Sequence, residues 1–192
     1  RVGGILVHSF TEFNVQTGGS ATFTGSAAIN NILGRVTGGN VSEIDGLIKS
    51  DIAAANLYLL NPYGFIFGEN SQVSVDGSFT VSTHKGIRFG EGQFNAVDPD
   101  KSVLVVSDAK PFGFLGDNPL GDIVLNGGSL SVSGAKQSIA LAGNQITFQD
   151  EAYIGSKNGG NVDIQASGLS VLSGSEIAVY GSEDYQGGQI NI

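Results

Sequence analysis

The sequence contains no cysteine, no methionine and no tryptophan, and it has only two histidines among its 192 residues. Without cysteine the chain forms no disulfide and no thiolate metal site, although this does not fix its compartment. No apolar stretch approaches the length of a membrane-spanning helix. The HExxH, GxxxxGK[ST], GxGxxG and GxSxG patterns are also missing, which removes the usual sequence signals of several enzyme classes. We therefore expect no cofactor and no metal.

Charge is also scarce, since Asp, Glu, Lys and Arg together make up 14% of the chain. The 9 basic and 18 acidic residues give a net charge of −9, which repels phosphate backbones and anionic membrane surfaces. Nucleic acid is thus not an expected partner. Hydrophobic residues make up 40% of the chain, too many for a disordered protein, and the length favours a single domain over residues 1–192.

Glycine is abundant, with 30 residues, and it punctuates short stretches of apolar and polar alternation that run from about residue 121 to the end. A period of two is typical of strands with one buried and one exposed face. The stretches read GDIVL, SLSVS, SIALAG, QITFQD, NVDIQA, LSVLSG, EIAVYG and QINI.

A longer repeat is also present, because GGNVDI at 159–164 returns as GGQINI at 187–192, 28 residues later. Two further strand-like stretches lie between the copies. A repeat of this length with about three strands indicates a solenoid, and the spacing leaves no room for crossover helices. The sequence therefore predicts an all-β fold, a parallel β-helix, with a β-sandwich as the alternative.

A turn separates two apolar runs, LYLL (57–60) and FIF (65–67), which read as buried strands. Asn61, Pro62 and Gly64 fill the first, second and fourth positions of a type I turn with the residues that each position favours. We expect the Asn61 side chain to bond the backbone two residues on. Replacing Asn61 by alanine should then cost about 1 kcal/mol, one net hydrogen bond.

Two segments depart from the strand pattern. AAINNILGRV (27–36) has apolar residues at helical spacing, but its paired asparagines and Gly34 disfavour a helix. Residues 93–120 contain three of the four prolines, which interrupt sheet ladders. We expect this segment to leave the coil as an excursion, with VLVV (103–106) as one strand, and to return at Gly121.

Parallel β-helices include carbohydrate-active enzymes, whose acidic and basic residues face one groove. No catalytic motif is present, and we expect no enzymatic activity and no small-molecule substrate. If the fold did carry catalysis, the candidate residues are Asp51, Asp76, Asp98, Asp100, Asp150, Glu151, Lys85 and Arg88.

Six stretches, in this order and over essentially the whole chain, resemble the N-terminal secretion domain of filamentous-haemagglutinin-like exoproteins, the two-partner secretion (TPS, or TpsA) family. The stretches are GGILVHSFTEFNV (3–15), INNILGRVTGGN (29–40), NLYLLNPYGFIFG (56–68), GSFTVST (77–83), IRFG (87–90) and PFGFLGDNP (111–119).

The turn at 61–65 is similar to the Asn-Pro-Asn-Gly-Ile motif of this family, with Tyr63 and Phe65 in place of its second asparagine and its isoleucine. The resemblance thus assigns the secretion motif to Asn61, Pro62, Tyr63, Gly64 and Phe65. A second family motif, Asn-Pro-Asn-Leu, has no literal match. Its counterpart is expected around GRVTGGN, with Asn30, Asn31, Arg35, Thr37 and Gly38 as supporting residues.

The resemblance implies a right-handed parallel β-helix whose N-terminal cap residues are missing here. It also implies an exported, monomeric domain at the cell surface or in the medium, which reaches the periplasm with its signal peptide removed. There the POTRA domains of an outer-membrane TpsB transporter recognise it, and it nucleates β-helix folding at the surface. The alternatives are a carbohydrate-active β-helix enzyme and a glycan-binding adhesin module.

Overall fold

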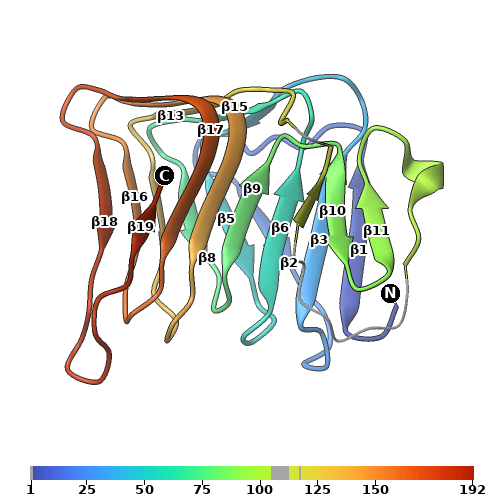
Figure 1. Ribbon diagram of the computed structural model, residues 1–192, viewed down its shortest axis with the longest axis horizontal. Helices are drawn as coiled ribbons and strands as arrows, with labels where there is room; N and C mark the ends of the chain where they lie inside the picture. Colours follow the sequence, from blue (N-terminus) through green and yellow to red (C-terminus); the bar gives the residue numbers. More distant parts are fainter. Residues whose placement is uncertain (1, 105–112, 117) are drawn as a thin grey trace.

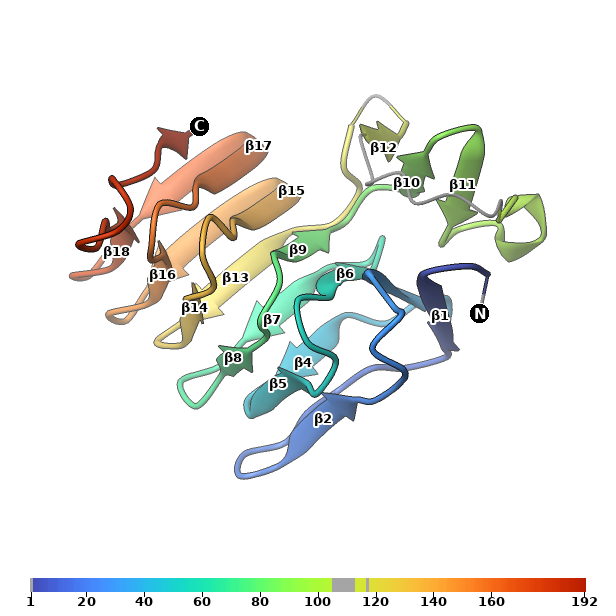
Figure 2. The same ribbon diagram turned by 90° about the horizontal axis from the view of Figure 1, so that it is seen from below.

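The chain forms a parallel β-solenoid of about seven turns, each with up to three strands that face three directions. The computed structural model describes residues 2–104, 113–116 and 118–192. Figure 1 shows the turns stacked side by side from the N-terminus on the right to the C-terminus on the left. Figure 2, seen from below, shows the strands of each face succeeding one another along the stack.

The strands belong to three faces. Face 1 holds β1 (Ile5–Phe10), β3 (Asn31–Val36), β6 (Asn56–Leu60), β9 (Phe79–Ser82), β19 (Ile190–Asn191) and the first parts of β15 (Ile139–Gln149) and β17 (Val162–Val171). Face 2 holds β4 (Ser42–Ile44), β7 (Phe65–Phe67), β13 (Ile123–Asn126) and the second parts of β15 and β17. Face 3 holds β2 (Ser20–Phe23), β5 (Leu47–Ser50), β8 (Gln72–Ser74), β14 (Ser129–Val132), β16 (Tyr153–Ser156) and β18 (Glu176–Val179).

The register confirms the 28-residue repeat. Val162 pairs with Ile190 and Asp163 with Asn191, in parallel, so GGNVDI and GGQINI lie on successive turns. The glycines before these strands stack closely, since a Cβ on Gly188 would lie 1.9 Å from the carbonyl oxygen of the glycine at 160. The parallel pairing excludes the β-sandwich. The right-handed coil implied by the resemblance stays a prediction.

The core fills the inside of the coil. It is built from the inward side chains of all three faces, which alternate with exposed ones along most strands. Phe65 and Phe67 stack inside it with ring centroids 5.9 Å apart. Among the described residues no helix is long and apolar enough to cross a membrane.

The excursion leaves face 1 after β9 and returns before β13. Its neck is closed, because the Leu120 N–H donates to the Thr83 carbonyl and the Thr83 hydroxyl donates to the Gly121 carbonyl at 2.8 Å. The return at Gly121 is therefore confirmed. Between the two ends, β10 (Gly86–Phe89) pairs in antiparallel fashion with β11 (Gly92–Asn95) and β12 (Gly113–Leu115).

The predicted start of the excursion at residue 93 was too late, because β10 already belongs to it. The prolines, on which the prediction was based, lie only in the second half of the excursion. The first half, β10 and β11, consists of short strands whose sequences resemble those of strands in the coil. A three-residue 3-10 turn at Pro99–Lys101 follows β11. Val103 of the predicted VLVV strand bridges Gln93, while residues 105 and 106 lie outside the described part.

The excursion sheet packs against the outer side of face 1 over β1, β3 and β6 (Figures 1 and 2). A second core joins the two layers. It comprises Ile5, Leu33, Leu60, Ile87, Phe89, Phe94 and Ala96. This second layer explains why LYLL is continuously apolar: Leu57 and Leu59 face the solenoid core, while Tyr58 and Leu60 face the excursion sheet.

Two further local interpretations have clear outcomes. The segment 27–36 is no helix, since β3 occupies Asn31–Val36. SIALAG and QITFQD, taken as separate strands, form the single strand β15, which bends around the corner between faces 1 and 2. NVDIQA and LSVLSG merge in the same way into β17.

Candidate functional site

The predicted turn joins β6 on face 1 to β7 on face 2. The Gly64 N–H donates to the Asn61 carbonyl at 3.1 Å, and the Tyr63 N–H donates to the Asn61 side-chain oxygen at 3.0 Å. Gly64 has a φ of +118°, and a Cβ there would lie 2.7 Å from the Asp122 carbonyl oxygen. Only glycine meets both conditions. The turn geometry predicted from the sequence is confirmed.

Asn61 does more than close this turn. Its side chain is fully buried, and its amide also donates to the Asn40 carbonyl at 2.9 Å and to the Ser42 hydroxyl at 3.0 Å. These bonds attach the third turn of the coil to the second. The structure raises the expected cost of Asn61→Ala above about 1 kcal/mol, because the substitution leaves the buried Ser42 hydroxyl and two part-buried backbone groups without this partner.

Tyr63, in contrast, points into solvent with 50% of its surface exposed. Val41, Ile66 and Leu120 beside it are 39%, 40% and 49% exposed, and together with Val124 these side chains line a hollow of about 390 Å³. We call these five residues the Tyr63 patch. Val41 and Leu120 were not predicted from the sequence, because they carry no motif and come from different turns of the coil.

Tyr63 and Phe65, the two residues that differ from the family motif, lie in different environments. Phe65 is 1% exposed and belongs to the core, where a larger apolar side chain replaces the isoleucine of the motif. Tyr63 stands outside and leaves the turn geometry intact. Of the two, Tyr63 is the one that changes the surface.

GRVTGGN, the expected counterpart of the second motif, runs beside the turn. A Cβ on Gly39 would lie 3.9 Å from Cζ of Tyr63, next to the Asn40 carbonyl that accepts from the Asn61 amide. Thr37 donates its N–H to the Phe10 carbonyl at 2.9 Å, and Gly38 lies so close to the preceding turn that no Cβ fits. Thr37 and Gly38 therefore hold successive turns in register.

Asn30 and Asn31 lie on the corner that leads into face 1. Asn30 is exposed and donates its backbone N–H to the Gly4 carbonyl, whereas Asn31 is buried and accepts a hydrogen bond from the Asn56 side-chain amide at 3.1 Å.

Asn56 also starts a ladder of side chains along the stack, in which each side chain accepts a hydrogen bond from a backbone N–H of the next turn. The accepting side chains are those of Asn56, Ser78, Ser138 and Asn161. They accept from the backbone N–H of Ser78, Ser138, Asn161 and Gln189, respectively.

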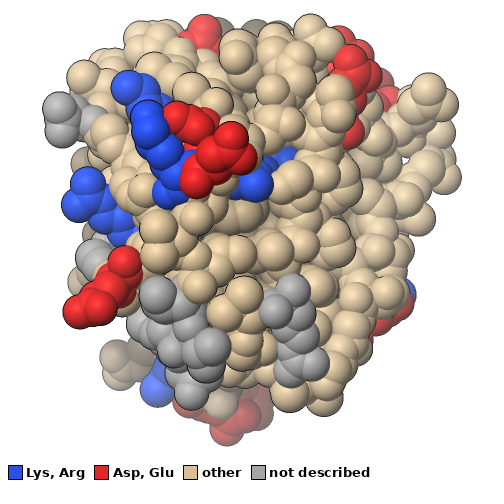
Figure 3. All heavy atoms as spheres, turned by 90° about the vertical axis from the view of Figure 1, so that its right-hand side faces the viewer, with Lys and Arg blue, Asp and Glu red and all other residues tan. Residues whose placement is uncertain are grey.

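Arg35 connects the solenoid to the excursion. Its guanidinium donates to the Ser9 hydroxyl, to the Asn95 carbonyl and to the Ser102 hydroxyl at 2.6–2.7 Å, and it lies 4.6 Å from the Phe94 ring centroid. Burial lowers its pKa, which the charge of a nearby aspartate partly offsets. Figure 3 shows this end of the molecule, where basic side chains gather beside acidic ones and further charged side chains lie toward the rim of the view. Arg35 thus has a structural role.

The carboxylates considered for catalysis are dispersed. Asp51 pairs with Lys49 at the end of β5, and Asp98 pairs with Lys101 in the excursion. Of these residues, Asp150 and Glu151 line one hollow together with Glu69, and its described lining contains no basic residue. Asp76, Asp100, Lys85 and Arg88 line none of the described hollows. Across the described residues, no group of three His, Cys, Asp or Glu could hold a metal ion.

The motif residues therefore meet around one corner of the second and third turns, except Asn30, Asn31 and Arg35, which lie elsewhere on face 1. Fold and site together define a β-solenoid with a structural turn motif and an exposed apolar patch beside it. A family model for the TPS secretion domain matches residues 1–191, and the chain belongs to this family. A comparison with curated proteins finds no match. Membership implies an exported exoprotein, a TpsB transporter partner and no catalytic role.

Proposed function

We propose that this domain is recognised by the POTRA domains of its outer-membrane TpsB transporter and then nucleates folding of the solenoid at the cell surface. The family assignment over residues 1–191 carries this proposal. The secreted or surface location, the monomeric state and the removal of a signal peptide belong to the same proposal. The residues assigned to recognition are Asn61, Pro62, Tyr63, Gly64 and Phe65.

The different settings of these residues support a division of roles. Asn61, Pro62, Gly64 and Phe65 are buried once the domain has folded, whereas Tyr63 is half exposed. Buried groups can meet a transporter only in the unfolded chain. Tyr63 is accessible in either state, so it is the side chain whose removal tests recognition without disturbing the fold.

Nucleation is supported by the distribution of burial. Strands β1, β3 and β6 are packed on both sides, against the solenoid core and against the excursion sheet. Burial on two sides removes more apolar surface from water per residue than burial on one side. We infer that these strands with the excursion sheet form the most stable unit, on which later turns stack.

The proposal is tested by co-expressing the domain with its transporter and measuring release into the medium. Tyr63→Ala should reduce release several-fold while leaving the melting temperature of the purified domain within about 2 °C of the parent, because an exposed side chain contributes little to stability. Tyr180→Ala is the matched control. Tyr180 is 46% exposed and lies after β18, far along the chain from the turn.

Release of the Tyr180→Ala variant should equal that of the parent. Equal release of the Tyr63→Ala variant would show that Tyr63 takes no part in recognition. Release of the parent without any transporter would contradict the secretion function as a whole.

A further inference from the structure

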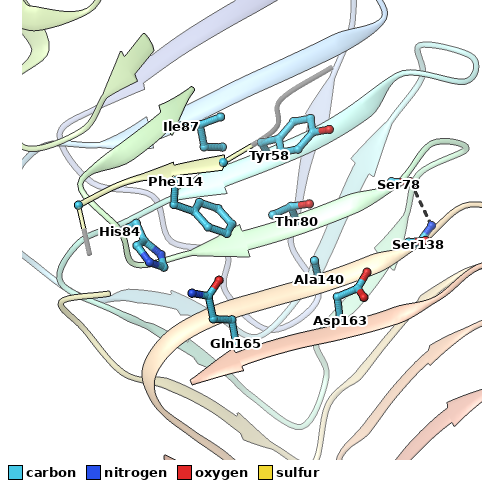
Figure 4. A pocket seen from close by; sticks show the side chains of 12 residues that line it. Tyr58, Ser78, Thr80, His84, Ile87, Phe114, Ser138, Ala140, Asp163 and Gln165 are labelled. Atoms are coloured by element: carbon cyan, nitrogen blue, oxygen red, sulfur yellow. Dashed lines mark hydrogen bonds between the residues drawn. The ribbon is translucent and has the colours of Figure 1, made fainter. Parts of the chain in front are cut away.

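A groove of about 510 Å³ runs between the excursion sheet and face 1. Its floor is the outer surface of β9, β15 and β17, with small residues such as Thr80 and Ala140 (Figure 4). Phe114 of β12 stands above the floor, and Tyr58 lies at the inner end. This volume is within the usual range of ligand sites.

The groove continues along the same strands. A second hollow of about 190 Å³ shares Phe114, Ala140, Asp163 and Gln165 with it and extends to Asn191 on β19. Because neighbouring strands lie about 4.8 Å apart, the floor presents equivalent positions at a regular spacing. The site is therefore elongated and suits a chain-like ligand.

Three polar side chains on the groove have no hydrogen-bond partner among the described residues. They are the Tyr58 hydroxyl, the Thr80 hydroxyl and the Gln165 amide, which come from β6, β9 and β17. Figure 4 shows them around one hollow. Burial raises the pKa of Tyr58 to about 12, so its hydroxyl keeps its proton and remains a donor. By contrast, the Ser78 and Ser138 hydroxyls are used within the ladder.

The lining residues define the class of ligand. Among the described residues, the lining includes no Lys or Arg, which disfavours an anion, and a single carboxylate, Asp163. Asp163 already accepts a hydrogen bond from the Asn191 amide at 2.5 Å. Glycosidic hydrolysis uses two carboxyl groups, so this chemistry supports binding and not cleavage. Hydroxyl and amide donors and acceptors beside aromatic rings suit a neutral molecule rich in hydroxyl groups.

We propose that this groove binds a neutral oligosaccharide, with its hydroxyls bonded to Tyr58, Thr80 and Gln165 and a sugar ring against Phe114. An extended peptide added to the edge of β12 is the competing occupant. Among the described residues that edge spans Gly113–Leu115, which offers few backbone bonds. A sugar is favoured over an extended peptide because the polar groups without a partner are side chains on the groove, whereas an added peptide strand would bond to the backbone of β12.

The test uses the purified domain on an array of neutral and acidic glycans, followed by calorimetry with the best neutral hexasaccharide. Tyr58→Phe and Gln165→Ala should each weaken binding about fivefold, the effect of one net hydrogen bond. Ala140→Leu, which fills the floor, should weaken binding more than tenfold. Thr147→Ala is the matched control, since Thr147 lies on face 2 of the same strand, β15.

Binding of neutral glycans that is reduced by the groove variants and unchanged by Thr147→Ala establishes the proposal. Several outcomes overturn it: no glycan binds, acidic glycans bind in preference, or Ala140→Leu leaves the affinity unchanged. Binding of extended peptides in place of sugars also overturns it and assigns the groove to the edge of β12.

Discussion

Asparagine side chains act in this protein as links between successive turns of the coil. Asn56 and Asn161 accept backbone N–H groups of the turn that follows, and Asn61 donates to a carbonyl of the turn before it. A short amide can serve both as donor and as acceptor, so it satisfies backbone groups at corners where the strand ladder is interrupted. Single residues thus carry contacts between segments that are distant in sequence.

Asn61→Ala should lower the stability of the folded domain by about 2–3 kcal/mol, because it leaves the Tyr63 N–H, the Asn40 carbonyl and the Ser42 hydroxyl without this partner. For a domain of this size the melting temperature should fall by about 4–12 °C. Thermal unfolding followed by circular dichroism measures this. Asn126→Ala is the control, since Asn126 is exposed and accepts one bond from Gln149. Equal melting of both variants would contradict the role of Asn61.

The two histidines predict a loss of stability at mildly acidic pH. Burial lowers the pKa of both His8 and His84. The unfolded chain binds protons near pH 6.5, so stability is complete above this value and falls as the pH drops through it. The lowered pKa of Asp45 acts only below its ordinary value of 3.8, outside this window.

Urea unfolding at pH 7.5 and pH 5.0 tests this, with a lower midpoint expected at pH 5.0. In a His8→Phe, His84→Phe double variant the difference should shrink. His8 and His84 stack on Phe10 and Phe114, so phenylalanine keeps the ring contacts at both sites but loses the bond between the Ser82 hydroxyl and Nδ1 of His84. An unchanged difference would assign the pH dependence to other groups.

At the scale of elements, the excursion sheet is an added layer fixed at its two ends and at Arg35. Its neck closes at Thr83, and its inner side covers the second core. The 3-10 turn at Pro99–Lys101 has no buried residue. Exposed turns of this kind are the usual sites of proteolytic cleavage.

Subtilisin should therefore cut first between Asp98 and Ser102. Arg35→Met should accelerate this cleavage several-fold, because it removes the bonds to Asn95 and Ser102 that hold the segment against the solenoid. Arg88→Met is the matched control, since the Arg88 side chain is exposed and has no partner among the described residues. Mass spectrometry identifies the sites, and first cuts within residues 121–192 would contradict the assignment of the exposed turn.

For the whole molecule, the solenoid distributes stability along one dimension, because each turn contacts mainly its neighbours. Strands in the middle of the stack are paired on both sides, whereas β18 and β19 each pair with one strand among the described residues. The large apolar side chains Leu172, Tyr180 and Ile190 are exposed near these strands. The last turn is therefore held less firmly than those before it.

Hydrogen exchange should be slowest in β6, β9 and the first part of β15, and at least about tenfold faster in β18 and β19. The physical reason is that strands paired on both edges open only when the stack itself opens, while terminal strands fray. Exchange measured by mass spectrometry on peptides from each turn tests this gradient. Uniform protection over all turns would show that the domain unfolds only as one unit.

The sequence by itself determined the β character of the chain, the 28-residue repeat and the turn at Asn61, because these depend on alternation and turn chemistry between near neighbours. Six stretches in a fixed order indicated the family. It did not determine that β10 belongs to the excursion, nor that Asn61 also binds Asn40 and Ser42. Nor did it bring Tyr58, Thr80 and Gln165 to one groove. Those features arise from contacts between turns, and no local pattern encodes which surfaces meet once the coil has closed.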